Sequence, residues 1–170
     1  ETVFSATGCS MAFPRSLFPK PFDEDYFCYS EDAFLSFRVR FMGLEVKQAP
    51  RSVVHHIGSA TTNRISSRVT TFYQERNRLL NLFLFFDRKV ILKLIPMAIA
   101  GSVGRCAFAV LSLLRLKRGR RKSVLGVLQG YLWPVIHAGK VIQKRREIQK
   151  EKKIRDEDVL ALMSCKVTNG

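Results

Sequence analysis

The clearest pattern of hydrophobic and polar positions lies between Val69 and Phe86. Apolar residues recur there at helical spacing, while charged and amide residues gather near the start of the segment. The apolar set comprises Phe72, Leu79, Leu80, Leu82, Phe83 and Phe86. This pattern predicts an amphipathic helix over Val69–Phe86 that packs one broad face against a core.

A second helical pattern begins at Glu31. Its apolar positions are Ala33, Phe34, Phe37 and Phe41, widened by Leu35 and Val39. Ser30 is a suitable N-cap residue, and carboxylates in the first turn suit the helix dipole. Gly43 is a typical C-terminal stop. We therefore expect a short amphipathic helix that begins after Ser30 and ends at Gly43.

The segment Val90–Leu116 is more apolar than either helix, but Pro96 and Arg105 interrupt it. A membrane-spanning helix needs about 20 predominantly apolar residues, and an Arg near its middle costs about 2.5 to 3.5 kcal/mol. We therefore expect two short helices in or near a membrane interface. A full span and a buried helical hairpin remain the alternatives.

The rest of the C-terminal half is predicted to be helical and basic. Val124–Ile142 has the pattern of an amphipathic helix, and its Tyr131 and Trp133 suit a membrane interface. Lys140–Arg155 predicts a solvated basic helix, and residues 156–170 are expected to fray.

Strand patterns are short and lie in the first third of the chain. Gly8–Phe13, Leu44–Gln48 and Ser52–His56 are brief runs bounded by glycine, proline or polar residues. Such runs predict short strands. Together with the helix that starts at Glu31, they indicate an α/β arrangement for the N-terminal half.

Charge changes this picture by pointing to an anionic partner. The chain of 170 residues carries 29 Lys and Arg against 14 Asp and Glu, a formal net charge of +15. Such an excess favours nucleic acid, membrane lipid or a phosphorylated substrate. A basic cluster at 115–122 directly follows the apolar run, a pattern typical of contact with an anionic leaflet.

The four cysteines and the start of the chain add two expectations. The cysteines are far apart and form no CxxC pair, which argues against a zinc site and suits a reducing compartment. The chain opens without Met or a signal-peptide pattern, so we expect it to begin within a longer protein.

The carboxylates of Glu31 and Asp32 admit two interpretations. They suit the start of a helix, where acids are common. Alternatively, one of them faces a cleft as a general base, which requires a nearby hydroxyl and surroundings that tune its pKa. His55 and His56 are neighbours, so on a strand at most one of them faces a given site.

An ordered set of residues resembles the second half of an inverting family 2 glycosyltransferase with a GT-A fold, of the rhamnosyltransferase-like kind. The resemblance covers about residues 2–80, and no single dipeptide carries it. The set comprises Gly8–Phe13, Phe22–Glu24, Tyr26, Phe27, Tyr29, Glu31, Asp32, Leu35, Ser36, Arg38, Gly43, Pro50, Val53, Val54, His56, Gly58, Ser59, Tyr73 and Arg76–Arg78.

The resemblance implies roles for individual residues. Asp32 would be the catalytic base, and Glu31 would orient it or contact the acceptor. His56 would help to bind a divalent cation, Mg²⁺ or Mn²⁺, that neutralises the leaving diphosphate. Substrate contacts would come from Tyr73, Arg76 and Asn77.

The resemblance also implies an architecture and partners. Residues 1–88 would form the acceptor-side half of a GT-A domain, and residues 89–170 a helical, basic, membrane-associating tail. A nucleotide-sugar would be the donor and a glycan or lipid-linked molecule the acceptor, at the cytoplasmic face of the cell membrane. Since the nucleotide-binding half is not present, the chain alone is predicted not to transfer sugar.

Two functions without enzymatic activity remain open. Basic clusters with aromatic residues also suit nucleic acid, but no helix-turn-helix, zinc-finger or RNP-like motif is present, so we expect no nucleic-acid partner. The other alternative is a non-enzymatic membrane-binding module in which Glu31 and Asp32 serve only the helix start.

Overall fold

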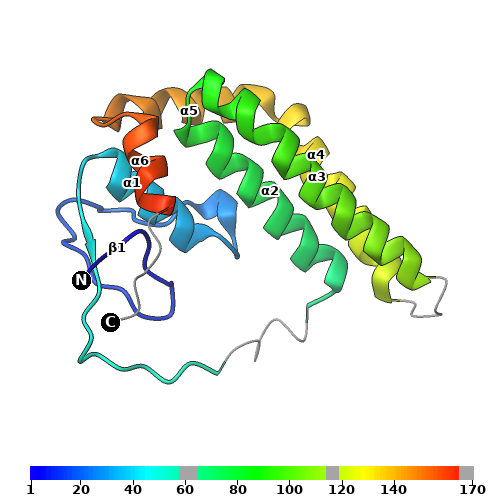
Figure 1. Ribbon diagram of the computed structural model, residues 1–170, viewed down its shortest axis with the longest axis horizontal. Helices are drawn as coiled ribbons and strands as arrows, with labels where there is room; N and C mark the ends of the chain where they lie inside the picture. Colours follow the sequence, from blue (N-terminus) through cyan, green and yellow to red (C-terminus); the bar gives the residue numbers. More distant parts are fainter. Residues whose placement is uncertain (58–64, 114–118, 165–170) are drawn as a thin grey trace.

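The computed structural model describes residues 1–57, 65–113 and 119–164 of the chain. Its elements, in chain order, are β1 (Thr2–Val3), the 3-10 helix η1 (Glu24–Tyr26), α1 (Glu31–Phe41), β2 (Val46–Lys47), α2 (Ser67–Phe85), α3 (Arg88–Leu113), α4 (Gly119–Ile136), α5 (Ala138–Glu151) and α6 (Asp156–Ser164). Helix α4 contacts both α2 and α3, while α5 crosses the end of α2 and also contacts α1 (Figure 1).

The two helices with the strongest sequence patterns are confirmed. Helix α1 begins at Glu31 and ends at Phe41, and Gly43 follows with a positive φ of 77°. Helix α2 spans Ser67–Phe85, close to the predicted bounds. In both, the apolar positions expected from the 3.6-residue period supply buried side chains.

Three predictions for the C-terminal half are wrong in detail. Where two short helices were expected, α3 is one continuous helix with Pro96 inside it. The amphipathic segment divides at His137 into α4 and α5. Residues 156–164 form α6 where fraying was expected, because Val159 and Asp156 are buried against the rest of the fold. The basic cluster at 115–122 lies largely outside the described residues.

The sheet is limited to one short antiparallel pair in the residues described. Strands β1 and β2 align Thr2 with Lys47 and Val3 with Val46. Gly8–Phe13 and Ser52–His56 form no strand, so those two predictions are wrong. The mostly helical architecture agrees with the helical part of the predicted fold class. The GT-A half stays a prediction.

A full membrane span was one alternative for the segment Val90–Leu116. In the parts of the chain with described structure, no helix combines the length and the apolar character that a membrane span requires.

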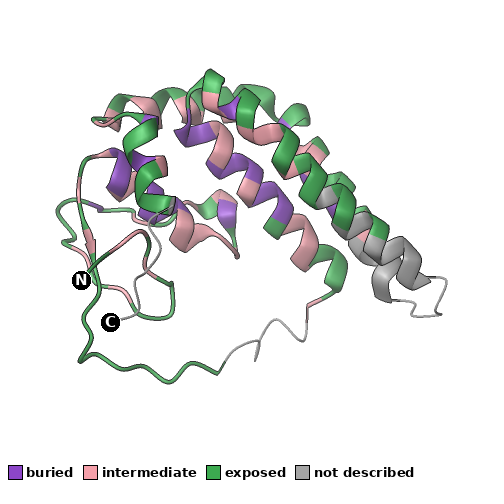
Figure 2. Cartoon of the chain, viewed as in Figure 1, coloured by how far each residue is buried: buried purple, intermediate pink, exposed green. Residues whose placement is uncertain are grey.

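Aromatic side chains of α1 and α2 form the centre of the core (Figure 2). Phe41 stacks on Phe85 with ring centroids 5.7 Å apart and an interplanar angle of 12°. Phe37 stacks on Phe85 at 5.5 Å and meets Phe86 edge to face at 5.6 Å. Such pairs add about 0.5–1.5 kcal/mol each beyond the burial of area. The same core includes Ile91 and Val159, so it is shared by residues on both sides of position 88.

Helix α5 supplies the hydrogen bonds that the end of α2 lacks. The last carbonyl groups of a helix have no partner within it. Arg145 donates to the carbonyls of Phe83 and, at 2.7 Å, Phe86. Gln149 donates to those of Leu84 at 2.8 Å and Phe85 at 2.9 Å. Helix α5 is therefore oriented by backbone groups of α2 as well as by apolar packing.

Two glycines set the distance between α4 and α2. A Cβ atom on Gly126 would lie 2.5 Å from the Arg68 carbonyl oxygen, and one on Gly130 would lie 3.0 Å from Cβ of Glu75. The backbone of α4 therefore lies directly against α2, and larger residues at these two positions would push the helices apart.

Substituting Gly126→Ala tests this packing. We expect the free energy of unfolding to fall by about 1–3 kcal/mol, because the added methyl overlaps a backbone oxygen. The matched control is Gly139→Ala in α5, where an added Cβ meets no atom within 4 Å. That change should stabilise by about 0.5–1 kcal/mol, since alanine favours helix over glycine. Urea unfolding measures both, and equal effects would contradict the packing argument.

Candidate functional site

The Glu31–Asp32 pair follows a turn with unusual backbone conformations. Phe27, Tyr29 and Ser30 have positive φ values of 55°, 67° and 62°. Non-glycine residues rarely adopt such values, and each costs on the order of 1–3 kcal/mol. Ser30 occupies the N-cap position, but its side chain makes no capping hydrogen bond. The predicted serine cap is therefore wrong, and tertiary contacts hold the turn.

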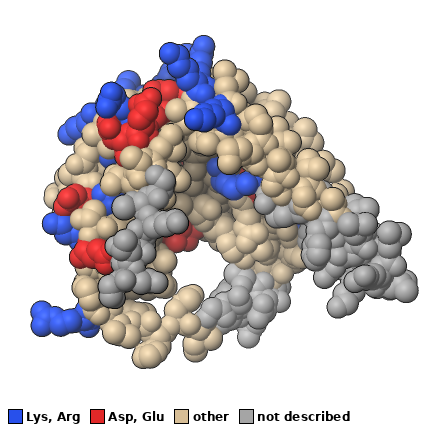
Figure 3. All heavy atoms as spheres, in the orientation of Figure 1, with Lys and Arg blue, Asp and Glu red and all other residues tan. Residues whose placement is uncertain are grey.

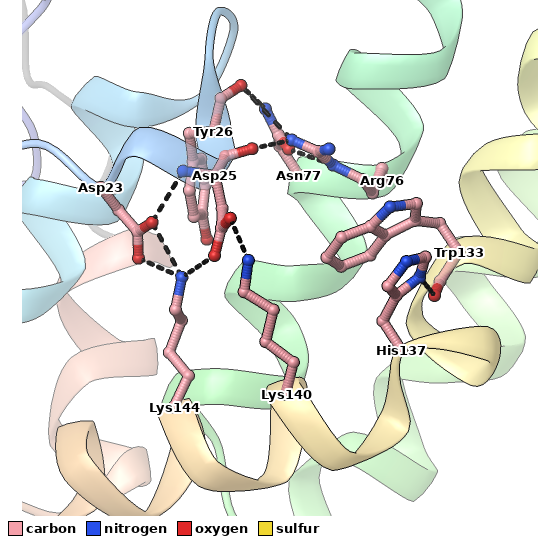
Figure 4. Close-up of polar contacts among 9 residues, drawn as sticks. All are labelled: Asp23, Asp25, Tyr26, Arg76, Asn77, Trp133, His137, Lys140 and Lys144. Carbon is pink, nitrogen blue, oxygen red and sulfur yellow. Dashed lines mark hydrogen bonds and ion pairs between the residues drawn. The ribbon is translucent and has the colours of Figure 1, made fainter.

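Asn77 on α2 is the main contact that holds this turn. Its side chain is fully buried. Its Nδ2 donates to the carbonyl oxygens of Tyr26 at 3.0 Å, Cys28 at 2.9 Å and Tyr29 at 2.6 Å. The positive φ values of Phe27 and Tyr29 bend the backbone here, so that three nearby carbonyls reach one side chain; Figure 4 shows the bond from Asn77 to the carbonyl of Tyr26. One amide therefore fixes the direction in which the chain enters α1.

Arg76 extends this contact along the same turn. Its guanidinium donates to the carbonyl oxygens of Asp25 and, at 3.4 Å, Tyr26. It also lies 4.6 Å from the ring centroid of Tyr73 and 4.8 Å from that of Trp133. Burial lowers the pKa of Arg76, partly offset by nearby acidic and tyrosyl groups. The aromatic rings and carbonyls replace the water that this cation would otherwise bind.

The predicted substrate-binding residues thus lie together behind the turn. Arg76 and Asn77 are buried with protein groups as partners, and Tyr73 is partly buried with its ring 5.1 Å from that of Phe27. Contact with a substrate stays a prediction for all three. Their observed contacts position the turn that leads to Glu31 and Asp32.

Asp32 accepts hydrogen bonds from two backbone N–H groups. Oδ2 lies 3.1 Å from the Gly8 nitrogen, and Oδ1 lies 2.7 Å from the Ala33 nitrogen. The bond to Ala33 fits a role at the helix start, and the bond to Gly8 connects the carboxylate to a segment 24 residues earlier. The bond to Ala33 therefore supports the helix-start interpretation, and the general-base interpretation stays a prediction. The two bonds fix the direction of the carboxylate.

Glu31 has a buried oxygen that its protein surroundings do not satisfy. Within the described residues, Oε2 of Glu31 is buried and has no hydrogen-bond partner. A Cβ atom on Gly8 would lie 3.6 Å from Oε1 of Glu31 and 3.8 Å from Oδ2 of Asp32, so the Gly8 backbone covers both carboxylates. A buried carboxylate oxygen without a donor is costly.

The acidic residues before the turn bind α5. Lys144 lies 2.6 Å from Oδ2 of Asp23 and also pairs with Asp25, and Lys140 pairs with Asp25 as well (Figure 4). Burial alone would raise the pKa of Asp25, but hydrogen bonds and charge from Lys140 and Lys144 lower it below the usual 3.8. Asp23-Glu24-Asp25 has the Asp-x-Asp spacing often used for metal, yet here lysines pair with it.

The sequence offered a weak signal for this contact. Lys140 and Lys144 are four residues apart and so share one face of a helix, and the acidic triplet is a cluster of complementary charge. The lysines and the acidic residues lie more than 100 residues apart in the sequence, so no local pattern indicates that they pair.

The predicted metal ligand lies apart from any group of ligands. His56 is exposed in an extended segment after β2. Over the described ranges, no three His, Cys, Asp or Glu side chains gather closely enough to hold a metal ion. The chain's described residues therefore do not form a metal site by themselves. Gly58 and Ser59, which belong to the resemblance, lie outside the described residues.

Replacing Asn77 by aspartate tests how the turn is held. Asn77→Asp keeps the shape but removes the donor and places a carboxylate against three carbonyl oxygens. We expect a loss of about 3 kcal/mol in the free energy of unfolding. The control is Gln74→Glu on the exposed face of α2, which should change stability by less than about 0.5 kcal/mol. Comparable urea midpoints for the two variants would show that Asn77 does not hold the turn.

Removing the two lysines tests the contact with α5. A Lys140→Met, Lys144→Met variant should lose about 1 kcal/mol at pH 7, as expected for partly exposed ion pairs. The folded-state pKa of Asp25 is lowered, so the pairs stabilise above the unfolded value of about 3.8, and this contribution is lost as pH falls through the folded value. Wild type and variant should therefore converge near pH 2, whereas exposed Lys150→Met should show no such pH dependence.

Comparisons with known proteins give no further guide to the site. No protein-family model, curated protein or solved structure matches the chain. The assignment of the site therefore rests on its geometry and on the residues that carry the resemblance.

Proposed function

We propose that this chain forms the acceptor side of an inverting sugar transferase, with Asp32 as the general base. The observation that carries the proposal is the buried, unpartnered Oε2 of Glu31 beside the oriented carboxylate of Asp32, as found in the described residues. The pair lies at the start of a helix whose entry turn is fixed by Asn77. Such fixed carboxylates suit the positioning and deprotonation of a hydroxyl group.

The proposed step is a single displacement. A second hydroxyl of the acceptor donates a hydrogen bond to Glu31, while the attacking hydroxyl gives its proton to Asp32 as its oxygen attacks the anomeric carbon of the donor. The bond between that carbon and the diphosphate oxygen breaks at the same time, and the electron pair leaves with the diphosphate. The configuration at the carbon is inverted, and Asp32 holds the proton until it is released to water.

Three elements position the reacting groups. The Gly8 N–H directs Oδ2 of Asp32, α2 holds the turn through Asn77, and α5 holds the acidic segment through Lys140 and Lys144. A divalent cation would balance the diphosphate charge. Among the described residues, no three His, Cys, Asp or Glu side chains lie close enough together to hold this cation.

A cavity of about 280 Å³ lies between α1, α2, α3 and α6, with mostly apolar walls that include Phe37, Leu79 and Leu94. Neither Glu31 nor Asp32 lines it, because the two carboxylates lie on other faces of α1 than the lining residues Ser30, Ala33 and Phe37. The proposed acceptor therefore stays a glycan or a lipid-linked molecule.

The test is transfer by a protein that joins this chain to a nucleotide-binding half. A panel of nucleotide-sugars with a divalent cation is assayed for wild type, Asp32→Asn and the control Asp158→Asn, a half-exposed acid on α6. We expect Asp32→Asn to lose at least about 10²-fold in kcat while nucleotide binding is retained, and the control to keep full activity.

Two outcomes would overturn the proposal. Equal activity of Asp32→Asn and wild type would leave Asp32 as a helix-start residue with the base elsewhere. If the wild-type protein transfers sugar from none of the nucleotide-sugars in the panel, the transferase assignment would be wrong. That result would favour a non-enzymatic binding module. The chain by itself is expected to be inactive, and Asp32-dependent transfer by it would show that no nucleotide-binding half is required.

A further inference from the structure

Helix α4 presents an apolar stripe that no described part of the chain covers. The exposed large side chains of this helix lie at intervals of three, four and seven residues, which is one helical face. They are Leu125, Leu128, Leu132, Val135 and Ile136, with exposed fractions of 49–73%. Gly126 and Gly130 lie on the opposite face and pack against α2. Because Gly126 and Gly130 hold the opposite face of α4 against α2, the apolar stripe faces away from α2.

Helix α3 lies beside α4 and widens this apolar surface (Figure 1). Its exposed large side chains are Leu92, Met97, Ile99 and Val103. In Figure 3 the described side chains over the middle of α3 are mostly uncharged, and Lys and Arg side chains gather over α5 and the start of α3. Together the exposed faces of α3 and α4 form what we call the hairpin face. Apolar surfaces of this extent usually mark an interaction site.

The charge around the hairpin face indicates which class of partner can bind there. Residues 88–136, from the start of α3 to the end of α4, contain 10 Lys and Arg and no Asp or Glu. Lys89 and Lys93 are exposed at the edge of the face. A second copy of the chain would cover the apolar residues but would bring together two strongly basic surfaces, which repel. Nucleic acid would match the charge but would leave the leucines uncovered.

We propose that the hairpin face binds an anionic lipid surface. Helices α3 and α4 lie along the membrane plane, with the stripe of α4 inserted about 5–10 Å, at the depth of the headgroup and acyl boundary. Lys89 and Lys93 contact lipid phosphates, and each such basic residue strengthens binding about fivefold. A groove between α2 and α4, lined by Val69, Phe72 and Leu132, continues the apolar surface inward.

Vesicle binding by the chain tests this proposal without any need for enzymatic activity. Trp133 is the chain's single tryptophan and lines the groove between α2 and α4 that continues the apolar surface, so its fluorescence reports lipid that reaches this groove. We expect binding to vesicles of phosphatidylglycerol and phosphatidylcholine, at least tenfold weaker binding to phosphatidylcholine alone, and quenching of Trp133 by brominated lipid.

Two variant pairs and one control separate the contributions. Leu128→Glu with Val135→Glu should weaken vesicle binding at least tenfold, and so should Lys89→Glu with Lys93→Glu. The control places glutamates at Val53 and Val54, which are equally exposed but lie in the segment after β2. That control should bind like wild type, and circular dichroism confirms that each variant is folded. Leu125→Ser with Ile136→Ser repeats the test if the glutamate pair unfolds.

Several results would overturn the proposal. These are the absence of vesicle binding by wild type, unchanged binding by both hairpin-face variants, or an equal loss in the control. Dimers in light scattering that dissociate in Leu128→Glu, Val135→Glu, without vesicle binding, would assign the face to a second copy. Preferential binding of RNA that lysine reversal abolishes, with no lipid binding, would assign it to nucleic acid.

Discussion

Buried backbone carbonyl groups without partners in regular structure are the constraint on which this fold depends. Three segments expose such groups to the interior: the turn before α1, the end of α2 and the strand β1. Each is satisfied by long polar side chains from a helix. Asn77 and Arg76 serve the turn, Arg145 and Gln149 serve the end of α2, and Arg40 donates to carbonyls of Val3 and, at 3.1 Å, Phe4. An unsatisfied buried carbonyl costs about as much as a lost hydrogen bond, so these contacts fix how the helices meet.

Helix α2 has a double role in this arrangement. Its apolar face completes the aromatic core with α1, and its polar residues hold the irregular turn that leads into α1. Tyr26 shows how closely the two roles meet, because its ring packs on Phe34 at 4.9 Å while its hydroxyl donates to Asn81 at 2.5 Å. Burial raises the pKa of Tyr26 well above its usual value, so this hydroxyl stays a donor. These contacts determine where α1 begins, and therefore where Glu31 and Asp32 lie.

Some charged side chains join elements of the fold through ion pairs, and others are proposed to bind a partner. Arg38 forms a bidentate pair with Glu151, with both nitrogen–oxygen distances at 2.6 Å, and hydrogen bonding to that glutamate raises the pKa of Arg38. Lys140, Lys144 and Lys152 likewise pair with acids in other elements. The sequence from the start of α3 to the end of α4, residues 88–136, holds ten Lys and Arg and no Asp or Glu. In the functions proposed here, an interfacial hairpin would keep the carboxylate pair close to a lipid-linked acceptor.

The sequence by itself determined the elements whose signal is local. Helices α1 and α2, the stop at Gly43 and the aromatic core positions follow from a 3.6-residue period that a few turns suffice to display. The net positive charge and the candidate pair Glu31–Asp32 are also direct properties of the sequence. Tertiary structure decided the left-handed turn, the continuous α3, the ordered α6 and the true partners of Arg76, Asn77 and Lys144. Each of these depends on groups 48 or more residues apart or on the burial of a whole face, and no local pattern records which distant carbonyl or carboxylate a side chain will meet.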